Sequence, residues 1–114
     1  MAKFIDIISP IYQDLVSRCE RRKVSVNLDF QDLTMRLSQE DEEKVAKFYT
    51  TEIKRALKNC AAGDKITLAQ SGNRFSIKSS ARTPLDAETV EKLRASGHEV
   101  RARFGYDTVV AIRI

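Results

Sequence analysis

The sequence predicts an α+β protein, a two-layer α/β sandwich in which helices cover one face of a mostly antiparallel sheet. Three observations predict this fold. One long segment has the apolar spacing of a helix, two shorter segments have weaker helical patterns, and pairs of segments with alternating apolar and polar residues lie between them. The 114 residues are enough for one core, so we expect a single domain over residues 1–114.

Residues 39–60 form the predicted central helix. Apolar side chains recur every three or four positions, as on one buried helix face, at Val45, Phe48, Tyr49, Ile53, Ala56, Leu57 and Cys60. Ser38 is the expected N-cap, and acids follow in the first turns, where the helix dipole favours negative charge. Gly63 is expected to end the helical stretch.

The chain before this helix is predicted to begin with a short edge strand at residues 4–7. Ser9 and Pro10 then suit the N-cap and first turn of a helix that ends near residues 21–23. Alternation of apolar and polar residues predicts two strands, over residues 24–30 and 33–38.

Two hairpins and a short helix are predicted after the central helix. Residues 65–69 and 74–78 alternate around a polar loop that contains Gly72, as in a β-hairpin. Asp86 is expected to cap a short helix that stops before Gly97. The last hairpin is expected to join residues 99–104 to residues 108–114.

Composition and charge narrow the possible functions. The net charge of +4 comes from 20 bases interspersed with 16 acids, so it does not by itself indicate a nucleic-acid-binding protein. No apolar run approaches the roughly 18 residues of a membrane span, and Asp6 falls where a signal peptide would be apolar. We therefore expect a cytoplasmic protein. Cys19 and Cys60 lie far apart in helical patterns and are expected to be packing thiols rather than metal ligands.

The segment 51–60 reads Thr-Glu-Ile-Lys-Arg-Ala-Leu-Lys-Asn-Cys, and residues 63–67 read Gly-Asp-Lys-Ile-Thr. With the order of elements, these segments resemble the ATP-binding catalytic domain of sensor histidine kinases, the Bergerat or GHKL fold, whose N-box reads Asn-Leu-Leu-x-Asn-Ala-Leu-Lys-Tyr-Thr. Residues 4–7 resemble the opening strand of that family and residues 108–114 resemble its final strand. The resemblance implies this fold with the Gly-rich ATP lid deleted, since only a short helix at residues 86–96 precedes the terminal hairpin.

The same resemblance places six residues at the nucleotide pocket of the family, namely Thr51, Arg55, Lys58, Ser79, Ala81 and Thr83. Arg55 stands where the family has an asparagine that holds Mg²⁺, and an arginine offers no oxygen ligand. Ser79 stands for the aspartate that binds adenine, and Ala81 and Thr83 stand for glycines that let the backbone approach the nucleotide. The resemblance therefore implies a vestigial pocket with no catalytic residue, no metal ligand and no bound ATP, and we predict no autokinase activity.

Our main hypothesis is a degenerate histidine-kinase-like domain of two-component signal transduction that acts as a protein-interaction or phosphotransfer-docking module. The expected partner is a response regulator or a kinase. The family's phosphotransferases carry their phosphohistidine on a helical hairpin, whereas His98, the only histidine here, follows Gly97 at a strand start and is expected to be a surface residue. We therefore expect either a fragment that lacks an N-terminal part or a protein that acts on the phosphotransfer of another protein.

Two alternatives remain open. One is a minimal nucleotide-binding domain with a pocket remodelled around Arg55, Lys58 and Ser79. The spacing of Thr51, Arg55 and Lys58 along one helix side fits either a solvated basic face or a site for an anion or acidic partner. The other alternative is a nucleic-acid-binding protein, which we do not expect because no RNA-binding signature occurs. Its candidate residues are Arg101, Arg103, Phe104, Tyr106 and Arg113.

Overall fold

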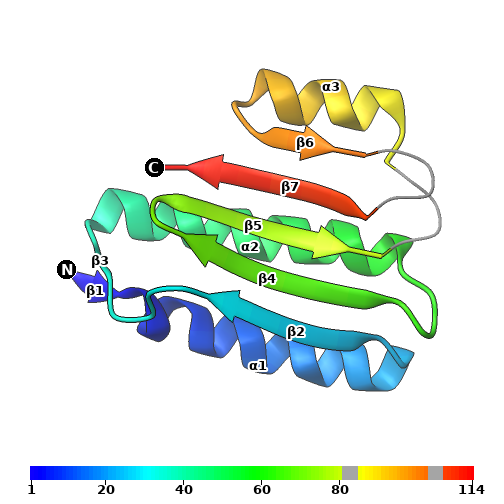
Figure 1. Cartoon of the computed structure of the whole chain (residues 1–114), viewed down its shortest axis with the longest axis horizontal. Helices are drawn as coiled ribbons and strands as arrows, with labels where there is room; N and C mark the ends of the chain where they lie inside the picture. Colours follow the sequence, from blue (N-terminus) through cyan, green and yellow to red (C-terminus); the bar gives the residue numbers. More distant parts are fainter. Residues whose placement is uncertain (81–84, 103–106) are drawn as a thin grey trace.

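The computed structural model describes residues 1–80, 85–102 and 107–114. The elements in chain order are β1 (Ala2–Lys3), α1 (Phe4–Arg22), β2 (Ser25–Phe30), β3 (Arg36–Leu37), α2 (Gln39–Asn59), β4 (Lys65–Ser71), β5 (Arg74–Ser79), α3 (Ala87–Ala95), β6 (Glu99–Arg101) and β7 (Thr108–Arg113). Five strands form one sheet in the order β2-β4-β5-β7-β6, and β1 pairs with β3. Figure 1 shows α1 and α2 behind this sheet, which confirms the predicted two-layer α+β fold.

The sheet is mostly antiparallel, as predicted, with one parallel pair. Strand β2 runs parallel to β4, with Ser25 opposite Lys65, and the pairs β4–β5, β5–β7 and β7–β6 are antiparallel. In Figure 1, β2 and β4 both point to the left, β4 lies above β2, and α2 lies behind them. The connection from β2 through α2 to β4 is therefore left-handed, whereas nearly all such connections are right-handed.

Helix α2 lies at the centre of the fold, and its bounds are close to those predicted. The Ser38 hydroxyl accepts a hydrogen bond from the amide of Asp41 at 3.2 Å, so Ser38 is the N-cap. The helix was predicted to end at Cys60, but its last residue is Asn59 and Cys60 is the C-cap. The buried side of α2 carries Tyr49, whose hydroxyl donates a 2.6 Å hydrogen bond to the carbonyl of Ala69 in β4 and so ties the helix to the sheet.

The predicted edge strand at residues 4–7 is wrong, because these residues form the first turn of α1 and only Ala2–Lys3 is a strand. Phe4 and Ile7 are buried, as helical spacing requires. Ser9 is not a cap, since it lies inside the helix and its hydroxyl donates to the Ile5 carbonyl at 2.7 Å. Pro10 also lies inside the helix. Because proline has no amide hydrogen, the carbonyl four residues earlier has no helical hydrogen-bond partner. Pro10 is exposed, so water can solvate that carbonyl.

For two other predicted strands, the described residues form a strand over only part of the predicted range, whereas the short helix begins as predicted. Of residues 33–38, only Arg36–Leu37 pair as a strand, with β1. The strand predicted from residue 99 is described as Glu99–Arg101, and its expected continuation at residues 103 and 104 lies outside the described residues. Helix α3 follows its predicted cap, because the Asp86 carboxylate accepts from the amide of Thr89 at 2.8 Å.

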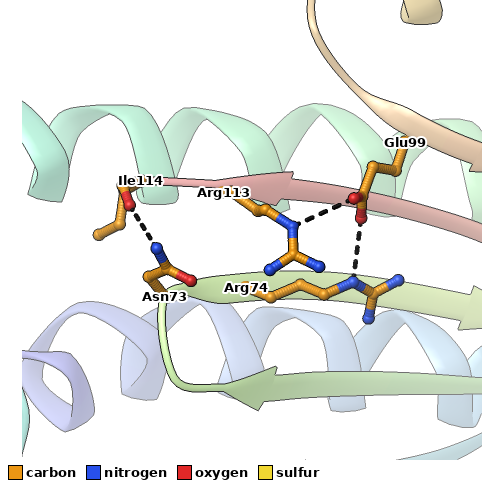
Figure 2. Close-up of polar contacts among 5 residues, drawn as sticks. All are labelled: Asn73, Arg74, Glu99, Arg113 and Ile114. Carbon is orange, nitrogen blue, oxygen red and sulfur yellow. Dashed lines mark hydrogen bonds and ion pairs between the residues drawn. The ribbon is translucent and has the colours of Figure 1, made fainter.

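The face of the sheet opposite α1 and α2 carries a group of ion pairs among the described residues. Figure 2 shows Arg74, Glu99 and Arg113 on this face. The Glu99 carboxylate accepts hydrogen bonds from Arg74 at 3.0 Å and from Arg113 at 3.1 Å, and these bonds hold the pKa of Glu99 below its ordinary value. Arg113 is one of the arginines considered for nucleic-acid binding, and here it is paired with the Glu99 carboxylate.

Candidate functional site

A small cavity lies between α2 and the neighbouring ends of β5 and β7. Its lining residues are Glu52, Arg55, Ala56, Asn59, Ile77, Ser79, Leu85, Thr108 and Val110. Its volume is about 20 Å³, which is room for about one water molecule. Small-molecule sites usually enclose about 300 to 1,000 Å³. As bounded by the described residues, the cavity is therefore far smaller than a site for a nucleotide.

An ion pair between Glu52 and Arg55 forms part of the cavity wall. The two residues lie one helical turn apart on α2, and a guanidinium nitrogen of Arg55 donates to the Glu52 carboxylate. The Glu52 side chain is 3% exposed, while that of Arg55 is 31% exposed. A carboxylate this deeply buried needs a charged partner, because its hydration is lost. Glu52 therefore holds the Arg55 guanidinium at the cavity.

The structure brings together two of the predicted site residues and separates two others. Arg55 on α2 and Ser79 at the end of β5 both line the cavity. Thr51 is exposed on α2 and does not line it, and Lys58 lines a different hollow, between α1 and α2. Ala81 and Thr83 lie outside the described residues.

Sequence reasoning missed Glu52, Asn59 and Thr108, which also line the cavity. Glu52 had a detectable signal. It lies four positions after Phe48 and four before Ala56, inside the apolar stripe of the central helix, where an acid requires an explanation. Thr108 had no such signal in the sequence. Its position at the cavity depends on the pairing of β7 with β5, which places Thr108 opposite Ser79.

The single histidine is less exposed than predicted. The His98 ring lies 5.7 Å from the ring of Phe48, between centroids, and its Nδ1 atom is buried without a hydrogen-bond partner among the described residues. His98 is therefore a half-buried packing residue at the junction of α3 and β6 rather than a surface histidine.

Both cysteines are free and buried. Burial raises the pKa of the Cys60 thiol to about 11, with a further contribution from the Asp64 carboxylate, and burial also raises the pKa of Cys19. Protonated thiols are poor nucleophiles and poor metal ligands. Within the described ranges, no three or more His, Cys, Asp or Glu side chains gather as a metal site would require.

The described helices are all too short or too polar to cross a lipid bilayer. No protein-family model and no curated protein matches the sequence. Solved structures do match in fold. The histidine kinase domain of the blue-light activated histidine kinase from Erythrobacter litoralis EL346 superposes with a TM-score of 0.75 at 15% identity, covering 100% of this chain and 65% of that one.

Two further histidine kinase structures show the same likeness. The catalytic domain of histidine kinase ThkA gives a TM-score of 0.71 at 12% identity and covers 98% of this chain and 94% of that one. The Acinetobacter baumannii histidine kinase AdeS gives 0.65 at 12% identity, with 98% of this chain and 64% of that chain covered. The chain therefore has the fold of histidine kinase catalytic, ATP-binding domains, a GHKL-like fold, as its sequence predicted.

Proposed function

We propose that this chain is a degenerate histidine-kinase-like domain of two-component signalling that has lost ATP binding and acts as a protein-interaction or phosphotransfer-docking module. The observation that carries the proposal is the cavity of about 20 Å³, in which the Arg55 guanidinium is held by the buried Glu52 carboxylate. The kinase-like fold supports a role in two-component systems, whose members act on protein partners.

The charge at the cavity argues against Mg²⁺-ATP. Mg²⁺ takes oxygen ligands in octahedral geometry, usually carboxylates, phosphates and water. A guanidinium in the place of the family's asparagine supplies no oxygen and repels the cation. The nearby Glu52 carboxylate is already engaged by Arg55, so it is not free to coordinate a metal without breaking a buried ion pair.

The same pair argues against the remodelled nucleotide pocket. That hypothesis needs the Arg55 guanidinium to bind phosphate, but this guanidinium already forms an ion pair with Glu52. The Glu52 carboxylate also adds a negative charge beside the place where a phosphate would bind. Lys58, the second base of that hypothesis, lies on the other side of α2, where it lines the hollow next to α1. The two bases therefore do not converge on one phosphate.

The test is a titration of the isotope-labelled chain with ATP and with a non-hydrolysable analogue, with and without Mg²⁺, followed through backbone amide shifts by NMR. We expect millimolar nucleotide to leave the amides of Glu52, Arg55, Asn59 and Ser79 unmoved. Titration with Mg²⁺ alone is the control for ionic effects. Saturable shifts at those four amides would overturn the loss of ATP binding.

The docking role is tested by adding purified response-regulator receiver domains, unphosphorylated and phosphorylated, to the same labelled chain. We expect saturable shifts confined to one surface of the domain. If neither the receiver domains nor a purified histidine kinase, added in the same way, changes the spectrum, the proposed role in two-component signalling is contradicted.

A further inference from the structure

Two hollows lie between α1 and α2. They have volumes of about 400 Å³ and about 220 Å³ and share Arg18 and Lys54 in their walls, and we treat them together as one groove. We call it the α1–α2 groove. Its lining residues are Pro10, Ile11, Asp14, Arg18, Arg21, Arg22, Thr50, Ile53, Lys54, Leu57 and Lys58.

One half of the groove is strongly basic. Five of the six residues around the larger hollow are Arg or Lys, three from α1 and two from α2. Arg18 pairs with Asp14 at 3.1 Å, and Arg22 donates to the Cys60 carbonyl at 3.2 Å. Among the described residues, Arg21, Lys54 and Lys58 have no acid within 4.0 Å, and residues 81–84 and 103–106 contain no Asp or Glu.

Compensation of the helix dipoles explains only part of this charge. Arg21 and Lys58 lie in the last turns of their helices, where bases are favourable. Lys54 lies more than one turn before the end of α2 and beyond the reach of that effect. Like charges from two helices face one hollow without intervening acids, so a negatively charged occupant is favoured electrostatically.

The apolar part of the groove is narrow. Ile53 and Leu57 come from successive turns of α2 and are only 4% and 5% exposed, and Ile11 of α1 is half buried beside them. Amphipathic helices bind such grooves with apolar side chains at positions i, i+3 or i+4, and i+7. A single-stranded nucleic acid would instead call for aromatic side chains on which bases can stack, and the lining residues include none.

We infer that the α1–α2 groove binds an acidic amphipathic helix of a partner protein, with apolar side chains on the floor and carboxylates against Arg21, Lys54 and Lys58. This inference rests on the proposed interaction role and specifies its site and the chemistry of the partner. The groove lies on a different side of α2 from the cavity that Arg55 and Ser79 line.

The test uses three fluorescent peptides of about 20 residues, long enough to present several helical turns. The first is a designed amphipathic helix with leucines on one face and glutamates flanking them. The second replaces the glutamates with glutamine, and the third replaces the leucines with serine. Binding is measured by fluorescence anisotropy, and the location is mapped by NMR on the amides of Arg18, Arg21 and Arg22, which lie on α1 away from the cavity.

Two triple variants provide the matched comparison, because each lowers the formal charge from +4 to +1. The groove variant carries Arg21→Gln, Lys54→Gln and Lys58→Gln. The control variant carries three substitutions at exposed lysines elsewhere, Lys65→Gln, Lys78→Gln and Lys92→Gln. We expect the groove variant to bind the first peptide about tenfold more weakly than the wild type, and the control variant to stay within about twofold.

Each peptide control has a defined outcome. We expect the glutamine and serine peptides to bind at least about tenfold more weakly than the first peptide. Equal binding of all three peptides, equal binding by both triple variants, or unmoved α1 amides would overturn the inference. Tighter binding of a DNA duplex than of the first peptide, with shifts at the same α1 amides, would assign the groove to nucleic acid instead. The ATP titration has its own readout, so either result can fail without the other.

Discussion

Removal of the Arg55 side chain should destabilise the domain. In an Arg55→Ala variant the Glu52 carboxylate, 3% exposed, loses its charged partner. Breaking a fully buried ion pair by removing one partner costs about 3 to 5 kcal/mol. The 31% exposure of the Arg55 side chain admits water to the pair, so we take roughly half of that range and expect a loss of about 2 kcal/mol.

The free energy of unfolding is measured by urea denaturation followed by circular dichroism. Lys58→Ala is the matched control, because it removes an exposed base from the same helix and should change stability by less than about 0.5 kcal/mol. A Glu52→Leu/Arg55→Met double variant replaces the pair with apolar groups and should recover most of the loss. An Arg55→Ala variant as stable as the control would refute the reasoning that the carboxylate depends on its partner.

Three further predictions concern hydrogen bonding, pH and thiol reactivity. Tyr49→Phe removes the bond to the Ala69 carbonyl and should lower the free energy of unfolding by about 1 kcal/mol, whereas Tyr12→Phe, at a partly exposed position, should not. Glu99→Gln should destabilise at neutral pH, and the difference from the wild type should vanish as pH falls from about 4.5 through the lowered pKa of Glu99, as measured by thermal unfolding. At pH 8 the protonated, buried Cys60 should react with a thiol reagent far more slowly in the native protein than in urea.

Each of these predictions has a contradicting outcome. Equal losses in the two tyrosine variants would show that the hydroxyl of Tyr49 does not stabilise the contact between α2 and β4. A stability difference for Glu99→Gln that persists at pH 2 would exclude its carboxylate charge as the cause. Rapid labelling of one thiol in the native state would contradict the burial of the cysteines.

The fold could be predicted because local signals agreed with the tertiary contacts at its centre. Ser38, the apolar stripe of α2 and the Gly72 loop each specify local structure, and the structure keeps all three. The residues at the start of α1 could not be placed, because four residues around Phe4 fit a strand or a helix equally well. Their packing against the rest of the core determines that they are helical.

The candidate site was less predictable because it depends on which side of α2 each residue occupies. Arg55 and Ser79 reach the cavity, but Lys58 faces α1, a difference that spacing along one helix does not reveal. The left-handed connection through α2 adds to the difficulty, since the usual right-handed rule would place α2 on the other face of the sheet. The three-dimensional structure was therefore needed to decide which side of α2 each candidate residue occupies.

The parallel pairing of β2 with β4 has a consequence for how the chain refolds. Ser25 and Lys65 are 40 positions apart (65 minus 25), whereas β4 and β5 are joined by a tight turn. Local hairpins form in microseconds, and long-range parallel pairs form late because a long loop must first close. Until β2 docks, β4 presents an open strand edge to other chains. Refolding yield should therefore fall as protein concentration rises, even though the native domain covers that edge.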